Sequence, residues 1–176
     1  MQIKRHYTQK GQSPYDGLEF EARISEVRHF DGRVLRQSEP IMVPKSWSHV
    51  ASDILAQKYI RKAGVPSETK LVKDTNFPDW LRQRQPTNDA TFGGETDARA
   101  VFNRMAGCWT HWGWKGGYFN AESDARSFFD EIRFMLATQM AAPNSPQWFN
   151  TGLHWAYGLT GPSPVSYTHL TLPTKA

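Results

Sequence analysis

The segment 142–152 combines polar side chains with residues that stiffen the backbone. It reads Ala-Pro-Asn-Ser-Pro-Gln-Trp-Phe-Asn-Thr-Gly, so Pro143 and Pro146 bracket Asn144 and Ser145. Each proline fixes its own φ angle and disfavours a helical conformation in the residue before it, so we expect Ser145 to be extended. A hydroxyl on a stiff loop beside a helix end is well placed to contact a ligand. The alternative is purely structural: one helix stops here, and another begins with Pro146 as its first residue.

Cys108 is the single cysteine of the chain, which also has six histidines. One thiol excludes a disulfide within the chain and fits a reducing compartment, so we expect a cytoplasmic protein. Cys108 and His111 lie three residues apart and can share a helix face, but a structural zinc site needs four ligands. We therefore expect no metal site here, and we interpret Cys108 as a small core residue.

The chain is basic, with a net charge of +4 and an isoelectric point near 9.3. The basic residues are spread out, which is typical of solvated surface and also suits a polyanion such as a nucleotide or a nucleic acid. Trp109, Trp112 and Trp114 form an aromatic segment that either stacks bases or packs one helix end against the next. No apolar run approaches the ~20 residues that span a bilayer, and no secretory signal follows the basic start.

Hydrophobic periodicity predicts the elements that position these residues. Alternation from Leu18 to Ser25 predicts a half-buried strand, and Asp31-Gly32 marks a turn into a returning strand at Val34. Helical spacing predicts three longer helices, from Ser46 or Ser48 to Gly64, from Thr96 to Trp109, and from Asn120 or Ser123 to Met140. Residues 67–94 are weakly patterned: we expect a short helix to start within residues 77–81, and a loop over residues 86–94.

Two separated strings resemble the class II, adenosylcobalamin-dependent ribonucleotide reductases. One runs from Pro143 to Leu153, and the other is Val43–Ser48 followed by Ala56–Tyr59. Their order and separation are also similar to the N-terminal part of the catalytic chain of that family. The resemblance covers residues 18–162, and it is specific because it rests on two unusual strings rather than on one glycine pattern.

The resemblance implies radical chemistry on a ribonucleoside diphosphate. In that family a cysteine thiyl radical, generated from adenosylcobalamin, abstracts the 3′-hydrogen, and a second pair of cysteines supplies the electrons. A thioredoxin-type reductant then restores the thiols, and nucleotide effectors regulate the enzyme. The resemblance is also compatible with a homodimer. Because three thiols are needed and Cys108 stands alone, we expect no catalytic residue in this stretch and no turnover by the chain itself.

The resemblance places the hydroxyl of Ser145 at the substrate phosphates. A hydroxyl can donate to a phosphate oxygen, and such a charge-assisted hydrogen bond contributes roughly 1.5–3 kcal/mol. Asn144 and Asn150 either orient the loop or contact the substrate. We favour the loop role for both, because asparagine commonly hydrogen-bonds its own backbone in turns.

We therefore predict a mostly helical α+β domain over residues 18–162, with an early hairpin and three or four helices. By resemblance it is an N-terminal fragment that leads into a ten-stranded α/β barrel. Residues 1–17 are expected to form a loose leader. Residues 163–176 resemble translated sequencing adaptor, so we expect a non-native and dispensable tail.

Two other functions fit parts of the sequence. The positive charge and the tryptophans suit a module that binds single-stranded nucleic acid. A small structural or interaction domain without a ligand is the third hypothesis. Neither accounts for the two strings, so the reductase interpretation is preferred.

Overall fold

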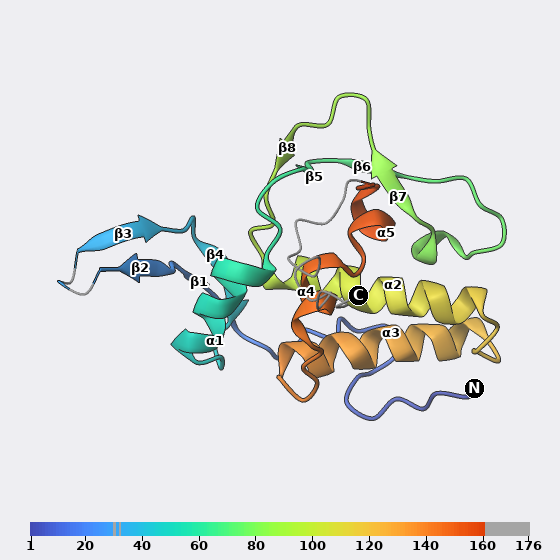
Figure 1. Ribbon diagram of the computed structural model, residues 1–176. Coiled ribbons are helices and arrows are strands. Elements are labelled where there is room, and N and C mark those ends of the chain that lie inside the picture. Colours follow the sequence, from blue (N-terminus) through green and yellow to red (C-terminus); the bar gives the residue numbers. More distant parts are fainter. Residues whose placement is uncertain (30, 32, 161–176) are drawn as a thin grey trace, which may run out of the picture.

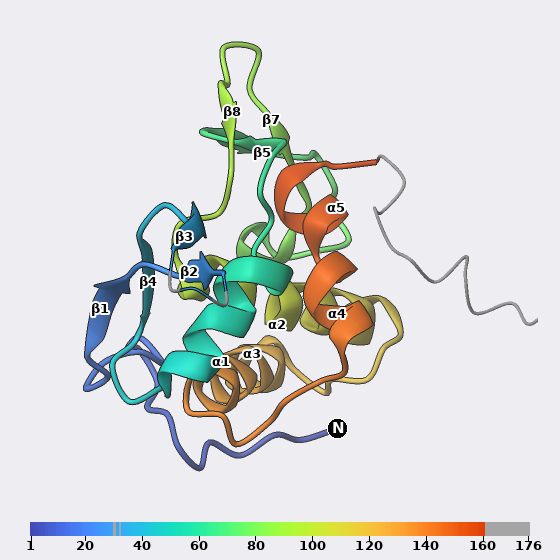
Figure 2. The ribbon, with the colours of Figure 1, turned by 60° about the vertical axis from the view of Figure 1, so that its left-hand side comes forward.

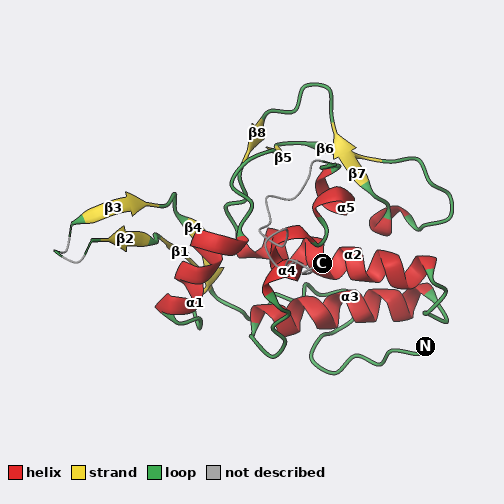
Figure 3. Cartoon of the chain, in the orientation of Figure 1, coloured by secondary structure: helices red, strands yellow, loops and turns green. Residues whose placement is uncertain are grey.

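The computed structural model describes residues 1–29, 31 and 33–160 of the chain. Two long antiparallel helices, α2 (Ala98–Lys115) and α3 (Glu122–Ala137), lie side by side at the base of the molecule (Figure 1). Shorter helices and four pairs of strands surround them (Figure 3), which confirms the mostly helical α+β prediction. The expected tail at 163–176 lies outside the described residues.

The helix α2 runs through the main core. The Asp97 carboxylate caps its start by accepting a hydrogen bond from the Arg99 N–H at 2.8 Å. The predicted cap, Thr96, is wrong by one residue, and the helix continues past the tryptophans to the Gly116 cap. Its predicted apolar face is buried and includes Val101, Phe102, Met105 and Cys108.

The helix α3 packs along α2 and brings the chain to the segment 142–152. Ala121 occupies the N-cap position, where its N–H donates to the Asp124 carboxylate at 3.0 Å. The predicted caps, Asn120 and Ser123, are wrong. Ala121 takes the N-cap position because the Asp124 carboxylate, in the first turn of the helix, accepts the hydrogen bond from its N–H. The helix ends at Ala137, before the expected Met140, and Gln139 follows with a left-handed φ of 60°.

The first strand pairs form at the edge of the helical body. β1 (Phe20–Arg23) pairs antiparallel with β4 (Ile41–Pro44), and β2 (Glu26–Arg28) pairs with β3 (Val34–Gln37). The expected hairpin is confirmed, and Figure 1 shows it projecting from the body. The single strand predicted over residues 18–25 is wrong in part. Ala22 and Ile24 are exposed, because the chain leaves the core after Phe20 to enter the hairpin.

The next helix is shorter than predicted. α1 (His49–Ile54) continues directly into a π-helical turn, η1 (Leu55–Tyr59), which ends before Gly64. The Ser48 hydroxyl caps α1 by accepting from the Ala51 N–H at 3.1 Å. The π turn inserts an extra residue, which rotates the buried face between the two parts. For this reason Val50 and Ile54 are exposed, although they belong to the apolar residues whose helical spacing predicts this helix.

The region 65–93 forms an arm of short strands; the short helix expected within residues 77–81 is confirmed as a 3-10 turn, whereas part of the loop expected over 86–94 is a strand. β5 (Val65–Pro66) pairs with β8 (Phe92–Gly93), and β6 (Thr69–Leu71) pairs with β7 (Arg84–Pro86). A single 3-10 turn, η2 (Asp79–Leu81), precedes β7. A second small core lies beneath this arm and contains Phe77, Leu81, Cys108 and Trp155.

Residues 1–17 contain no helix or strand, yet they lie along α3 (Figure 2). The Thr8 hydroxyl donates to the Glu131 carboxylate at 2.6 Å, and the Ile3 N–H donates to Asp124 at 2.9 Å. Tyr7 also stacks on Phe134 with 5.4 Å between ring centroids. The leader is therefore held rather than loose, because side chains of α3 satisfy its backbone donors. The domain boundaries at residues 18 and 162 remain a prediction.

Among the described residues, no helix is both long and apolar enough to cross a membrane.

Candidate functional site

The segment 142–152 becomes a short helix with a bend on either side. α4 (Ser145–Asn150) follows Asn144, which occupies the N-cap position with an extended ψ of 161°. The expectation of an extended Ser145 is wrong, because Ser145 is the first helical residue and Pro146 the second. Proline is tolerated there because an N–H in the first turn has no partner within the helix.

Tyr59 positions the hydroxyl of Ser145. The two hydroxyl oxygens lie 3.0 Å apart, and either group can be the donor. The Tyr59 ring stacks on Trp148 at 5.4 Å with an interplanar angle of 9°, and Phe149 meets it edge-on. Ser145 is half-buried as a result, whereas Asn144 is exposed.

The structure brings together the two strings on which the sequence interpretation rests. Tyr59 belongs to one and Ser145 to the other, and they are 86 residues apart in the chain. The Trp47 indole N–H of the earlier string donates to the Ala137 carbonyl at 2.7 Å, which fixes the end of α3. The first contact is made at the start of α4, and the second at the end of α3.

A buried ion pair beneath α4 was missed by the sequence reasoning. The side chains of Arg104 and Glu95 are fully buried, and Arg104 Nε lies 2.7 Å from a Glu95 oxygen. Arg104 also donates to the carbonyls of Trp148 and Thr151, each at 2.8 Å. These carbonyls belong to the C-terminal end of α4, where no intrahelical donor remains. Arg104 therefore both caps α4 and fixes its position over α2.

Glu95 connects this pair to two further parts of the chain. Its carboxylate accepts hydrogen bonds from the Arg61 N–H at 2.8 Å and from the Tyr157 hydroxyl at 2.9 Å. Burial and the neighbouring Glu95 carboxylate raise the pKa of Tyr157 well above its ordinary value, so the phenol keeps its proton and acts as a donor. One sequence signal could have indicated this ion pair: Arg104 is a basic residue next to the apolar positions of a core helix.

Gly152 allows α5 (Leu153–Tyr157) to follow α4 closely. Its φ is +86°, and a Cβ placed there would lie 2.0 Å from the Arg104 carbonyl oxygen. Only glycine fits this left-handed position against the backbone of α2. Gly107 similarly makes room for the Trp155 ring, which would lie 2.2 Å from an added Cβ.

Ser145 is the first residue of α4, and Asn150 is the last. Together with Thr151 and Gly152 it lines a pocket of about 410 Å³, whose other walls include Cys108 and His111. Neither Asn144 nor Ser145 lines this pocket. The structure thus sets Asn150 apart from Asn144 and Ser145, which stay together at the start of α4, and the contact of all three with substrate remains a prediction.

Burial favours the uncharged forms of Cys108 and His111. Burial raises the pKa of the Cys108 thiol to about 11, so it is protonated at neutral pH. Burial lowers the pKa of His111, whose ring stacks on Phe77 at 4.0 Å and whose Nδ1 lies 3.1 Å from the Leu81 carbonyl. The interpretation of Cys108 as a core residue is confirmed. Within the described residues, no group of three or more potential ligands is placed to hold a metal ion.

Comparison with known proteins identifies relatives along most of the chain. The vitamin B12-dependent ribonucleotide reductase of Bradyrhizobium diazoefficiens is 51% identical over 175 residues, and that of Agrobacterium fabrum is 51% identical over 170. These matches cover 95% and 92% of this chain, but only 14% and 13% of the relatives. The corresponding enzyme of Rhodopirellula baltica is 26% identical over 151 residues, which cover 86% of this chain and 12% of the relative.

The chain therefore spans about one seventh of the length of the curated relatives that it matches. The family model described as class II vitamin B12-dependent ribonucleotide reductase matches residues 21–139. This match includes α2, α3 and the string that contains Tyr59. On this evidence, the chain belongs to the class II vitamin B12-dependent ribonucleotide reductase family.

Proposed function

We propose that this chain provides a substrate-phosphate-binding segment of an adenosylcobalamin-dependent ribonucleoside-diphosphate reductase. The observation that carries the proposal is the hydroxyl pair of Ser145 and Tyr59, which lies at the start of α4. A hydroxyl that already has one fixed partner is oriented before a ligand arrives, which reduces the entropy lost on binding. Arg104 supports the same segment from below, through the carbonyls of Trp148 and Thr151.

Three of the proposed features belong to the whole enzyme. These are the diphosphate substrate, a thioredoxin-type reductant and control by nucleotide effectors. The single cysteine supports a reducing cytoplasmic setting.

Adenosylcobalamin would supply the radical that begins the reaction in such an enzyme. The one thiol among the described residues, Cys108, is buried in the second small core, so we do not assign it the role of the cysteine that receives this radical. The function proposed for this chain is limited to binding and orienting the substrate.

The nucleic-acid-binding alternative has less support. Trp109 packs against the main core, and the Trp114 indole N–H donates to the Asn76 carbonyl at 2.9 Å. Trp112 is exposed and is left as a stacking surface. One indole is a weak platform, since single-stranded binders use successive aromatic side chains.

The test is Ser145→Ala in a full-length enzyme that contains this segment. If the hydroxyl contacts phosphate equally in the ground and transition states, KM should rise about tenfold or more while kcat stays constant. Ser145→Thr keeps the donor and should retain most of the affinity. Ser123→Ala, at an exposed position at the start of α3, is the matched control and should change neither constant.

An unchanged KM with a lowered melting temperature would contradict the proposal. That outcome would make Ser145 a structural turn residue whose hydroxyl serves only Tyr59. Tyr59→Phe separates the two roles further, because it removes the partner of Ser145 but keeps the stacked ring. We expect a smaller rise in KM than with Ser145→Ala, since the serine hydroxyl remains.

A further inference from the structure

A buried histidine holds the arm against the helical body. The ring of His111, a residue that is 8% exposed, stacks on Phe77 of the arm with 4.0 Å between centroids and 8° between the ring planes. The Leu81 carbonyl lies 3.1 Å from His111 Nδ1, and it also accepts from the Trp155 indole N–H at 3.1 Å. These four residues, which we call the His111 cluster, join the arm to α2 and α5.

The hydrogen bond to Leu81 fixes the position of the proton on the neutral ring of His111. A carbonyl oxygen only accepts, so Nδ1 carries the N–H and Nε2 carries the lone pair. Among the described residues, Nε2 has no hydrogen-bond partner. A second proton would therefore create a charged donor at Nε2 without an acceptor, and a buried charge of this kind is costly.

Two of the three charged or titratable neighbours of His111 oppose that second proton. Lys115 lies one turn further along α2, and His154 lines the same pocket from α5. Asp74 of the arm is the one carboxylate among the residues that line the two pockets beside the ring. Burial is the largest cause of the lowered pKa of His111, and Lys115 and His154 add to it, whereas the Leu81 carbonyl and Asp74 act in the opposite direction.

His111 stands between two pockets. One has a volume of about 410 Å³ and contains Cys108, and the other has a volume of about 440 Å³ and is lined by Phe77 on the arm side. His111, Gln83 and Lys115 line both pockets. Movement of the arm away from the His111 ring would therefore join the two pockets and open a path to Cys108.

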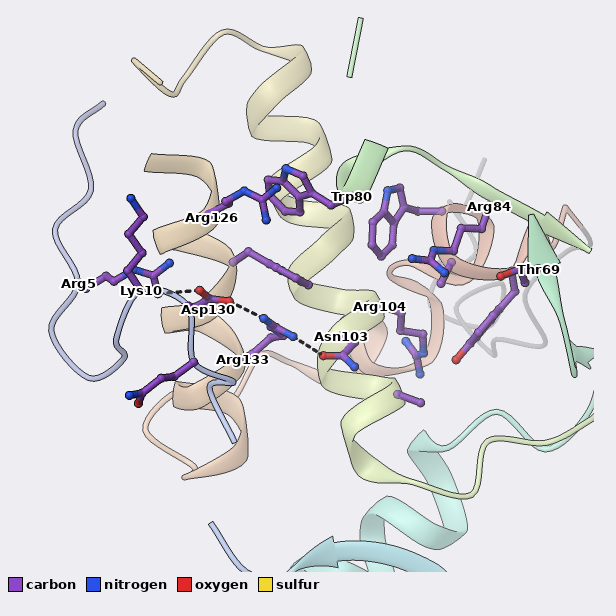
Figure 4. A pocket seen from close by; sticks show the side chains of 17 residues that line it. Arg5, Lys10, Thr69, Trp80, Arg84, Asn103, Arg104, Arg126, Asp130 and Arg133 are labelled. Atoms are coloured by element: carbon purple, nitrogen blue, oxygen red, sulfur yellow. Dashed lines mark hydrogen bonds and ion pairs between the residues drawn. The ribbon is translucent and has the colours of Figure 1, made fainter. Parts of the chain in front are cut away.

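A second attachment of the arm contains no histidine. The Trp80 ring lies over Arg126 of α3, with 4.5 Å between the guanidinium carbon and the ring centroid (Figure 4). The Trp80 indole N–H donates to the Glu122 carboxylate at 2.8 Å. Hydrogen bonds from Arg126 and Trp80 hold the pKa of Glu122 below its ordinary value, so this carboxylate stays charged at a pH of about 5.5. The attachment to α3 therefore persists under conditions that protonate a histidine.

We propose that His111 is an acid-sensitive switch, which keeps the arm closed while it is neutral and releases Phe77 and Leu81 from α2 when it gains a second proton. The second small core has few residues and is separate from the main core, so it can open while α2 and α3 stay packed. Trp80 keeps the arm attached to α3, so the opening is local and reversible.

The direction of the pH effect follows from the burial of the ring. The open state binds the second proton more readily than the closed state, so the closed arm is fully stable above the open-state pKa of about 6.5 and loses stability as pH falls below it. If the closed state stays neutral, the open fraction rises by up to about tenfold between about pH 7.5 and 5.5. Ordinary carboxylates titrate below this window.

The test is amide hydrogen exchange of the 176-residue chain at about pH 7.5 and 5.5, with each rate divided by the intrinsic rate at that pH. Protection over residues 77–85 should fall by up to about tenfold at the lower pH. The amides of α3 are the internal control and should keep their protection.

Two variants identify the histidine that responds to pH. His111→Asn keeps an N–H donor near the position of Nδ1 but cannot gain a charge, so the arm should show equal protection at the two pH values even if it is less stable at both. His154→Gln is the matched control, because it removes an exposed histidine from the same pocket. It should leave the pH dependence of the arm largely unchanged.

Three results would overturn the proposal. Equal protection of the arm at both pH values in the unmodified chain would mean that His111 does not control it. A pH dependence that survives His111→Asn, or that disappears with His154→Gln, would assign the effect to another group. A parallel loss of protection in α3 would mean global unfolding. The comparison of the arm with α3 needs no variant, so the proposal can be refuted even if His111→Asn does not fold.

Discussion

Replacing Arg104 with methionine tests whether the buried ion pair holds α4 in place. Arg104 and Glu95 are fully buried, and Arg104 also satisfies the carbonyls of Trp148 and Thr151. Removing one partner of a buried pair leaves an uncompensated charge, which costs about 3–5 kcal/mol. In a chain of this size 1 kcal/mol shifts the thermal midpoint by about 2–4 °C, so Arg104→Met should lower it by roughly 6–20 °C.

Thermal unfolding followed by circular dichroism measures this loss, and amide hydrogen exchange locates it. Exchange should accelerate most over residues 148–157, where Arg104 and Glu95 hold the backbone. Arg99→Met is the matched control, because Arg99 lies on the same helix and pairs with Asp97 at the surface. Exposed pairs contribute about 1 kcal/mol or less, so its midpoint should fall by no more than about 4 °C.

The double variant Arg104→Met with Glu95→Gln sharpens the test, because the amide oxygen can still accept from the Arg61 N–H and the Tyr157 hydroxyl. It removes the uncompensated charge together with its partner, so it should recover part of the lost stability. The reasoning is refuted if Arg104→Met melts within about 2 °C of the unmodified chain. It is also refuted if the double variant is less stable than Arg104→Met alone.

Three further predictions concern other parts of the fold. Gly152→Ala should cost about 1–3 kcal/mol from backbone strain, with the clash against Arg104 in addition; urea unfolding with an unchanged midpoint would contradict this. Burial alone acts to raise the pKa of Glu131, but hydrogen bonds from Thr8 and its neighbours bring it below the ordinary value. The stabilisation from these hydrogen bonds is complete above the unfolded pKa of about 4.3, and it is lost as pH falls through the lower folded pKa. The leader should therefore become sensitive to protease in that pH window. Glu131→Gln should remove this pH dependence. The Cys108 thiol should react slowly with a disulfide reagent at pH 8 and rapidly after unfolding, because it is buried and its pKa is raised to about 11; equal rates would refute its burial.

The long helices were predictable because their apolar faces repeat over many turns. The buried positions of α2, from Val101 to Cys108, follow that repeat closely. The hairpin was predictable for a local reason, since Asp31-Gly32 suits a turn. The four strands between residues 65 and 93 were not, because each has only two or three residues and too few positions to show alternation.

The candidate site was predictable only in part. Ser145 was singled out by the prolines and the string around it, but its bond to Tyr59 depends on packing between segments 86 residues apart. Arg104 and Glu95 gave no paired signal, because nine residues and a helix start separate them. A basic residue next to an apolar helix face is also compatible with a solvated side chain, so the sequence alone did not distinguish the two.

The hydrogen bonds between the leader and α3 bear on how the chain is made. Ile3 is bonded to Asp124 and Thr8 to Glu131, so these contacts join residues more than 120 positions apart. At a synthesis rate of about 5–20 residues per second, residues 3–8 precede their partners by roughly 6–24 s. During that interval residues 3–8 have no α3 to bind, and they dock only after Asp124 and Glu131 have been made. The leader is therefore synthesised well before the helix that holds it in its native place.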